Sequence, residues 1–169
     1  MSLLEDHLKW LNLHQEATLE PERPIVDPHH HFWPGEQHYL LEDLWLDTHS
    51  GHNIKKTVFI ECSQEFLKTG DIDFAPVGET IFVKKISDEA KKEKHKTQIE
   101  GIVGHVNLLI GPEKTHEVLT SHLKEGGNLF KGIRHAGGWD HHSELSNSHH
   151  SPPKNCLLYT SDAADDLTR

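Results

Sequence analysis

The sequence predicts an α/β fold in which parallel strands alternate with helices. Short runs of apolar and β-branched residues, each the length of one strand, alternate along the chain with longer segments in which apolar residues recur at helical spacing. Each of the four short runs is followed by a polar or ionisable residue, as at the carboxyl ends of neighbouring strands. The spacing between the runs suits right-handed crossover connections.

The expected elements follow one another from the amino terminus. Residues 1–13 carry leucines at helical spacing and predict a short amphipathic helix on the outside of the domain, and a proline-rich break at 20–24 follows it. Run 57–60 is apolar or β-branched throughout, as expected of a parallel strand buried on both faces. In order, the other predicted elements are strand 25–27, helix 39–45, helix 75–92, strand 99–106, helix 112–124 and strand 129–133.

Residues 27–31 read Asp-Pro-His-His-His and close the first apolar run. Because residues i and i+2 of an extended strand point to the same side, His29 and His31 can present two imidazoles to one metal ion, with His30 facing the other way. Neutral imidazole is the commonest side-chain ligand for zinc and similar ions. Ligands at the carboxyl end of a first strand lie where a (β/α) barrel places its active site.

Histidine is abundant in this chain, which weakens the significance of any single pair. There are 17 histidines among 169 residues, and the adjacent pairs at 141–142 and 149–150 illustrate how such pairs arise without a ligand role. The alternative for His29 and His31 is therefore a pair of exposed or hydrogen-bonded side chains. Two interpretations of the loop 139–153 are open: it shapes substrate choice, or its histidines face solvent and have no role.

Ionisable residues follow the later strands as well. Glu61 follows the second run, His105 lies near the end of the third, and Arg134 and His135 follow the fourth. Burying a charged group costs several kcal/mol unless it is paired or coordinating, so these convergent strand ends indicate a site. The alternative is that Glu61, His105 and Arg134 form an ion-paired network that only ties the edge together.

Composition excludes several function classes. The formal net charge of −10 and the scattered lysines argue against a nucleic-acid surface. No apolar stretch is long enough to span a bilayer, and the amino terminus lacks a secretory signal pattern. The two cysteines, Cys62 and Cys156, are too few for a disulfide scaffold. We therefore expect a cytoplasmic protein that acts on a small molecule, with no nucleic-acid or membrane partner.

Several motifs occur together in a familiar order. Segments 25–33, 39–43, 57–62, 101–105 and 132–135 resemble those of the amidohydrolase-related proteins, predicted TIM-barrel metal-dependent hydrolases. The resemblance covers about residues 24–153 and implies a (β/α)8 barrel, of which this chain would hold about the first four βα units. It further implies a divalent metal, usually zinc, and hydrolysis of lactones, amides or related bonds. Some relatives decarboxylate, and some lactonase relatives need no metal.

The resemblance also implies roles for individual residues. Glu61 and His105 would contact the metal or its bound water, and the Arg134 guanidinium would contact a substrate oxygen. The matching positions are His29 and His31 as metal ligands, Asp27 as the residue that orients a ring or the strand, Glu61 and His105 as catalytic residues, and Arg134, His135 and Trp33 as substrate-binding residues.

The chain departs from the family pattern in length and in ligands. A barrel of this kind needs eight strands and roughly 250 residues, and a catalytic zinc usually has three protein ligands. Residues 156–169 resemble the in-frame translation of a transposon-end sequencing adapter; the alternative is a genuine acidic tail. We therefore divide the chain into a helix and linker at 1–23, half of a barrel at 24–155 and an adapter-derived tail at 156–169.

These observations predict a metal-dependent hydrolase acting on a small lactone- or amide-like metabolite, inactive as this fragment. The alternatives are a metal-dependent decarboxylase on the same fold and a non-catalytic, histidine-rich metal-binding protein. Half a barrel would expose its edge strands and the inner faces of all four strands, which favours self-association. A natural half-barrel that pairs into a whole barrel is the corresponding alternative.

Overall fold

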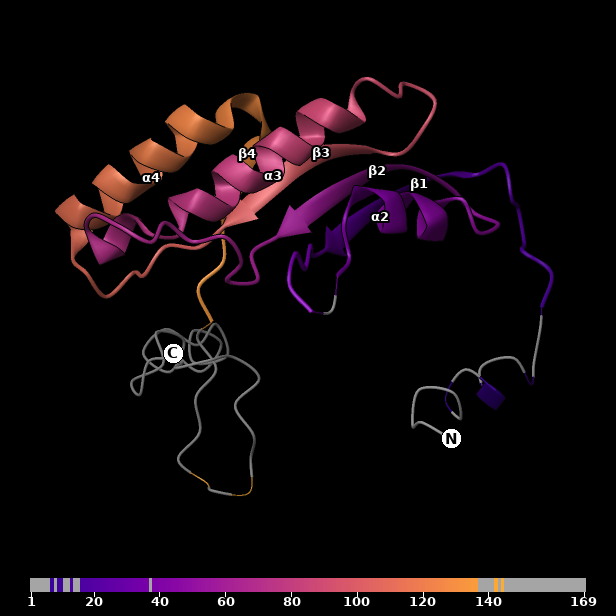
Figure 1. Ribbon diagram of the computed structural model, residues 1–169, viewed down its shortest axis with the longest axis horizontal. Coiled ribbons are helices and arrows are strands. Elements are labelled where there is room, and N and C mark those ends of the chain that lie inside the picture. Colours follow the sequence, from indigo (N-terminus) through magenta and orange to yellow (C-terminus); the bar gives the residue numbers. More distant parts are fainter. Residues whose placement is uncertain are drawn as a thin grey trace, which may run out of the picture.

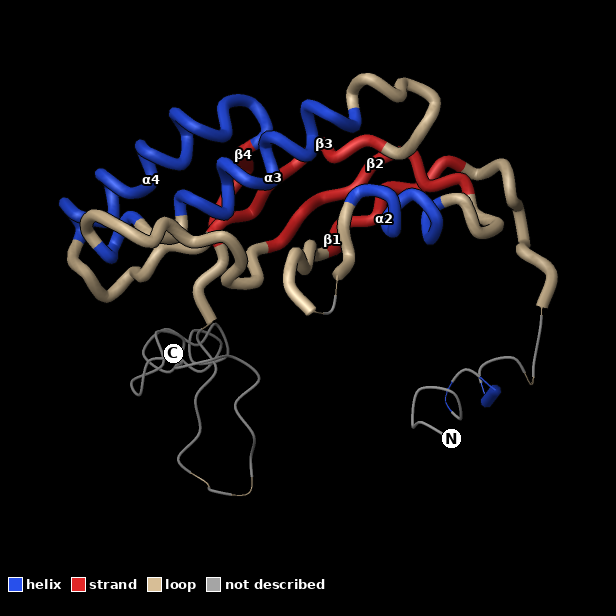
Figure 2. The backbone as a smooth tube through the Cα atoms, viewed as in Figure 1, coloured by secondary structure: helices blue, strands red, loops and turns tan. Residues whose placement is uncertain are grey.

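The computed structural model describes residues 16–36 and 38–136, together with positions 7, 9, 10, 13, 142 and 144. Strands and helices alternate along the chain, and the four strands form one parallel sheet in the order β1-β2-β3-β4 (Figures 1 and 2). The elements are β1 (Pro24–His30), α2 (Leu41–Thr48), β2 (Asn53–Ile60), the 3-10 turn η1 (Ile72–Phe74), α3 (Val77–Ala90), β3 (Gln98–Gly104), α4 (Pro112–Gly126), the 3-10 turn η2 (Gly127–Leu129) and β4 (Phe130–Ile133). The predicted α/β alternation with a parallel sheet is confirmed, and its assignment to the first four βα units of a (β/α)8 barrel stays a prediction.

One face of the sheet packs against the helices. Phe59 and Ile102 of the central strands are fully buried, and they form a single core cluster with Leu44 of α2 and Val83 of α3. In Figure 1, α3 and α4 lie next to each other over this face. Successive crossovers in one direction place every helix on the same side of a parallel sheet. Among the described residues, the core is therefore built on the sheet face that the helices cover.

The opposite face of the sheet is less covered. Val26 of β1 is 57% exposed, and Val58 and Val103 are half-buried. Val58 packs closely across the strand on Gly101, where a Cβ would lie 3.2 Å from a Val58 methyl carbon. Half of a barrel is expected to expose one apolar sheet face and two edge strands, which here are β1 and β4. Self-association through these surfaces stays a prediction.

Element boundaries differ from expectation by a few residues. Helix α2 begins and ends later than predicted. Its start is delayed because Tyr39 forms an isolated bridge with Trp33, and the Asp43 side chain accepts the Leu40 backbone N–H at 2.9 Å just before the first turn. Strand β3 ends at Gly104, so His105 lies just after the strand. The predicted helix at 1–13, the loop 139–153 and the tail 156–169 lie wholly or largely outside the described residues.

Strand β1 is longer than expected and irregular at Pro28. The pairing register with β2 shifts between Asp27 and His30, because proline has no N–H to donate to the ladder. The Asp27 carboxylate accepts the His29 backbone N–H at 3.0 Å across this irregularity. Strand pairing resumes at His30, opposite Phe59, and the chain then leaves the sheet.

None of the helices in the part of the chain that the structure describes is long and apolar enough to cross a membrane.

Candidate functional site

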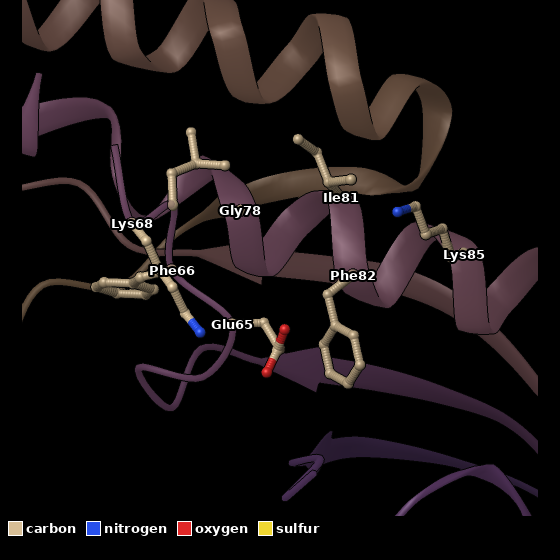
Figure 3. A pocket seen from close by; sticks show the side chains of 8 residues that line it. Glu65, Phe66, Lys68, Gly78, Ile81, Phe82 and Lys85 are labelled. Carbon is tan, nitrogen blue, oxygen red and sulfur yellow. The ribbon is translucent and has the colours of Figure 1, made fainter. Parts of the chain in front are cut away.

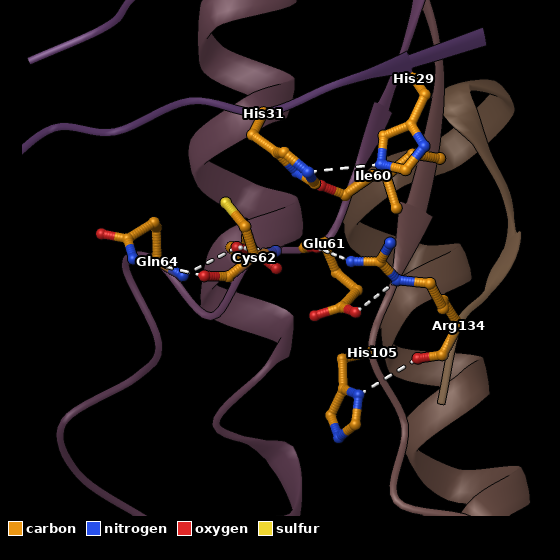
Figure 4. A network of polar contacts seen from close by, with 9 residues as sticks. His29, His31, Ile60, Glu61, Cys62, Gln64, His105 and Arg134 are labelled. Carbon is orange, nitrogen blue, oxygen red and sulfur yellow. Dashed lines mark hydrogen bonds and ion pairs between the residues drawn. The ribbon is translucent and has the colours of Figure 1, made fainter. Parts of the chain in front are cut away.

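The carboxyl ends of the four parallel strands bring the predicted polar residues to one edge of the sheet (Figure 4). His29 and His31 lie at the end of β1, Glu61 follows β2, and His105 follows β3. A fourth group, Arg134, follows β4 and reaches back over β3 to Glu61. The side chains meet because parallel strands all end on the same side of the sheet.

The two histidines of β1 point to the same place. Their Nε2 atoms are 3.3 Å apart. His31 Nδ1–H donates to the backbone oxygen of Ile60 at 2.8 Å, which leaves the Nε2 of that ring as an electron-pair donor. Burial lowers the pKa of His31, so its ring stays neutral at lower pH than an ordinary histidine. The alternation predicted for residues 29–31 is thus present in the structure.

This geometry fits two corners of a zinc site. Two nitrogens at roughly 2.0–2.1 Å from one tetrahedral ion are about 3.3–3.4 Å apart, which matches the distance between the two Nε2 atoms. Among the described residues, no group of three or more His, Cys, Asp or Glu side chains is placed to hold a metal. The described residues thus bring together two candidate ligands at this position.

His30 faces the other way and packs into the core. Its ring is edge-on to Phe32 and Phe59, with centroids 4.8 and 5.7 Å away, and it is only 7% exposed. Burial lowers the pKa of His30 to about 4, and its Nε2 has no hydrogen-bond partner within the described part of the chain. This ring is a packing group and takes no part in the site.

Glu61 and Arg134 form a two-point ion pair. Arg134 Nε–H donates to Glu61 Oε1 at 2.7 Å, and Nη2–H donates to the Glu61 backbone oxygen at 2.6 Å. The Glu61 side chain is 7% exposed and that of Arg134 30%. The structure thus contains the Glu61–Arg134 ion pair of the alternative interpretation, and whether that pair only ties the edge together stays open. Within the described residues, these two hydrogen bonds use two of the five N–H donors of Arg134.

His105 and His135 lie at the far side of the edge. His105 Nδ1–H donates to the Arg134 backbone oxygen at 3.1 Å, which leaves Nε2 as an acceptor. His135 lies edge-on to His105 with ring centroids 5.3 Å apart, and its Nδ1 accepts the Leu108 N–H at 3.2 Å. Burial lowers the pKa of His135, so this ring is also neutral over a wider pH range.

Trp33 lies beside the histidine pair. Its ring is tilted by 60° against that of His31, with centroids 5.7 Å apart. Its backbone N–H and oxygen pair with Tyr39, which closes the loop between β1 and α2. Trp33 therefore forms an aromatic wall next to the two imidazoles.

Two buried polar side chains behind this edge were not predicted. Glu79 of α3 accepts backbone N–H groups of the turn after β2, and His122 of α4 donates to the His105 backbone oxygen at 3.0 Å. Both lie one helical turn from a buried valine, at Val83 and Val118 respectively. That spacing places them on the core-facing side of their helices, and it is the sequence signal from which their burial could have been predicted.

One groove of the described surface lies away from this edge. It has a volume of about 300 Å³ and runs between the loop at 65–68 and helix α3. Figure 3 shows Phe66 and Phe82 on its walls with Lys68 and Lys85 nearby. None of the predicted site residues lines this groove.

Comparisons with protein-family models, with curated proteins and with solved structures found no match to this chain. The resemblance to amidohydrolase-related proteins therefore rests on the sequence motifs, and the structure establishes the parallel α/β sheet on which those motifs lie.

Proposed function

We propose that this chain carries part of the active site of a metal-dependent hydrolase of the amidohydrolase-related type, acting on a small lactone- or amide-like metabolite. His29 and His31 would hold a divalent metal, with zinc the first candidate. The observation that carries this proposal is the 3.3 Å separation of two Nε2 atoms at the carboxyl end of β1. The hydrogen bond from His31 to Ile60 adds support, because metal-bound histidines usually donate their other ring N–H to a fixed oxygen.

The surrounding residues supply groups that suit such a reaction. A bound zinc would lower the pKa of a water towards about 7 and polarise a carbonyl. The remaining Arg134 N–H groups form a fork suited to a carbonyl or carboxylate oxygen of the substrate. The Nε2 of His105 is a hydrogen-bond acceptor because its Nδ1–H donates to the Arg134 oxygen, and Trp33 would offer an apolar face against the substrate. Glu61 holds the Arg134 guanidinium in place.

A non-catalytic, histidine-rich metal-binding protein is the second candidate. It is favoured by the high histidine content and by the finding that only two candidate ligands converge within the described residues. In that case metal binding would be spread over several histidine pairs, and no single pair would dominate it.

Zinc titration of the purified chain separates the two candidates. We expect one equivalent of zinc to bind more strongly than any other, and replacement of His31 with alanine should weaken its binding at least about tenfold, or about 1.4 kcal/mol. His29→Ala should have a similar effect, because both nitrogens belong to the same coordination sphere. Isothermal titration calorimetry at pH 7.5 measures both affinity and stoichiometry.

Two controls define the outcome. His52→Ala removes an exposed histidine before β2, at the other end of the sheet, and should leave the titration unchanged. A double replacement of His149 and His150 removes a histidine pair elsewhere in the sequence. If this double variant lowers zinc binding as much as the loss of His31 does, the histidine-rich protein is the correct description and the hydrolase proposal loses its basis.

Turnover is the less informative measurement on this chain. With two protein ligands where three are usual, we expect hydrolysis of simple lactones to be absent or slow even with zinc present. Metal binding tests the proposal without requiring a complete site.

A further inference from the structure

The turn that follows Glu61 has an unusual backbone. Ser63 and Glu65 both adopt left-handed conformations, with φ of 62° and 51°. Residues other than glycine rarely occupy this region, and each occurrence costs on the order of 1 kcal/mol. Such a turn persists only when the surrounding structure fixes it. What fixes this turn therefore also fixes the chain directly after Glu61.

A buried carboxyl group on α3 fixes it. Glu79 Oε1 accepts the backbone N–H of Cys62 at 3.0 Å and that of Gln64 at 2.8 Å. Glu79 is 1% exposed, and its Oε2 has no hydrogen-bond partner among the residues that the structure describes. Burying a carboxyl group with one oxygen unsatisfied is costly, so a purely packing role would be better served by an apolar side chain.

The groups around Glu79 act on its pKa in opposing directions, and burial has the largest effect. Burial and, to a smaller extent, the nearby Glu61 carboxylate raise the pKa of Glu79, the backbone N–H groups of Gln64 and Cys62 lower it, and the net result is a pKa of about 7. From the same turn, the Cys62 thiol is neutral because burial raises its pKa to about 12. From α4, His122 packs against Thr80, the next residue of α3, and burial lowers the pKa of this histidine.

We propose that Glu79 is a positioning residue for the candidate site: by accepting the N–H groups of Cys62 and Gln64, it holds the turn after β2 and thereby sets where Glu61 meets Arg134. The connection is short. Glu61 directly precedes the turn, its N–H donates to the Val103 oxygen, and its own oxygen accepts an N–H of Arg134. A turn that rotates away would carry this backbone oxygen with it. The effect of Glu79 on substrate binding rests on the proposed function, in which Arg134 contacts the substrate.

The experiment is amide and arginine nuclear magnetic resonance on the full chain. Glu79→Gln keeps an oxygen acceptor, and Glu79→Ala removes it. We expect the Cys62 and Gln64 amides to exchange slowly with solvent in the wild type and the glutamine variant, and at least tenfold faster in the alanine variant. The Arg134 Nε–H signal should follow the same pattern, because its partner is displaced. Glu113→Ala removes the exposed first-turn glutamate of α4 and should change none of these signals.

A pH series keeps the test decisive if Glu79→Ala does not fold. In the wild type, the Cys62, Gln64 and Arg134 Nε–H signals should shift together with a midpoint near pH 7, and this shift should vanish in Glu79→Gln. Unchanged shifts in Glu79→Gln, or wild-type exchange in a folded Glu79→Ala, would overturn the proposal. Zinc titration of the same samples reports on the proposed function separately, since a chain that fails to bind zinc can still show these shifts.

Discussion

Replacing Arg134 with methionine is expected to lower the free energy of unfolding by about 2–4 kcal/mol. The change removes both donors to Glu61 and leaves a carboxylate that is 7% exposed without its cation. Breaking a buried ion pair from one side costs about 3–5 kcal/mol, and the 30% exposure of the arginine side chain reduces that figure. Urea unfolding followed by circular dichroism measures the difference.

An exposed arginine pair in the same chain provides the matched control. Arg23 Nη1 lies 2.6 Å from Glu20 Oε2, and the two side chains are 72% and 67% exposed. Arg23→Met should therefore change the free energy of unfolding by less than about 0.5 kcal/mol. A double variant with Glu61→Leu and Arg134→Met should recover part of the loss, since no buried charge is left unpaired. Equal effects of Arg134→Met and Arg23→Met would contradict the assignment of the Glu61–Arg134 pair as a buried interaction.

Replacing Gly78 with alanine should destabilise the protein by about 2–3 kcal/mol, although alanine ordinarily favours a helix over glycine by about 1 kcal/mol. A Cβ at this position would lie 2.4 Å from the Glu65 backbone oxygen and 2.7 Å from the Leu67 nitrogen. Because both neighbours are backbone atoms, the turn at 65–67 must move away from α3. Thermal and urea unfolding both register the loss.

Gly132 of β4 is the control for this prediction, because a Cβ there would meet nothing within 4 Å. Gly132→Ala should be neutral or slightly stabilising. If Gly78→Ala raises the stability as the intrinsic helix preference alone would predict, the turn does not pack on α3 as described.

The sequence was sufficient to predict the alternation of strands and helices and the convergence of strand ends. The apolar run at 57–60 and the histidine alternation at 29–31 are local signals, because strand period and burial act over a few residues. The side-by-side placement of His29 and His31 and the opposite orientation of His30 follow from that period, and the structure has both.

The less predictable features depend on contacts between distant segments. The Glu61–Arg134 pair joins residues 73 positions apart, and a sequence pattern cannot tell whether such a carboxylate faces a metal or a guanidinium. The irregularity of β1 depends on how Pro28 meets β2, and the role of Glu79 depends on the path of the turn after β2. These features are set by packing across the sheet. The periodicity of a single sequence carries no information about such contacts between distant segments.

The measurement that tests the central proposal most directly is zinc K-edge X-ray absorption on the chain loaded with one equivalent of zinc. We predict scattering from two imidazole nitrogens at roughly 2.0–2.1 Å with lighter-atom ligands completing the sphere, and loss of one imidazole contribution in His29→Ala or His31→Ala. A spectrum dominated by sulfur at roughly 2.3 Å, or one unchanged when both histidines are replaced, would place the metal elsewhere and contradict a zinc site at the end of β1.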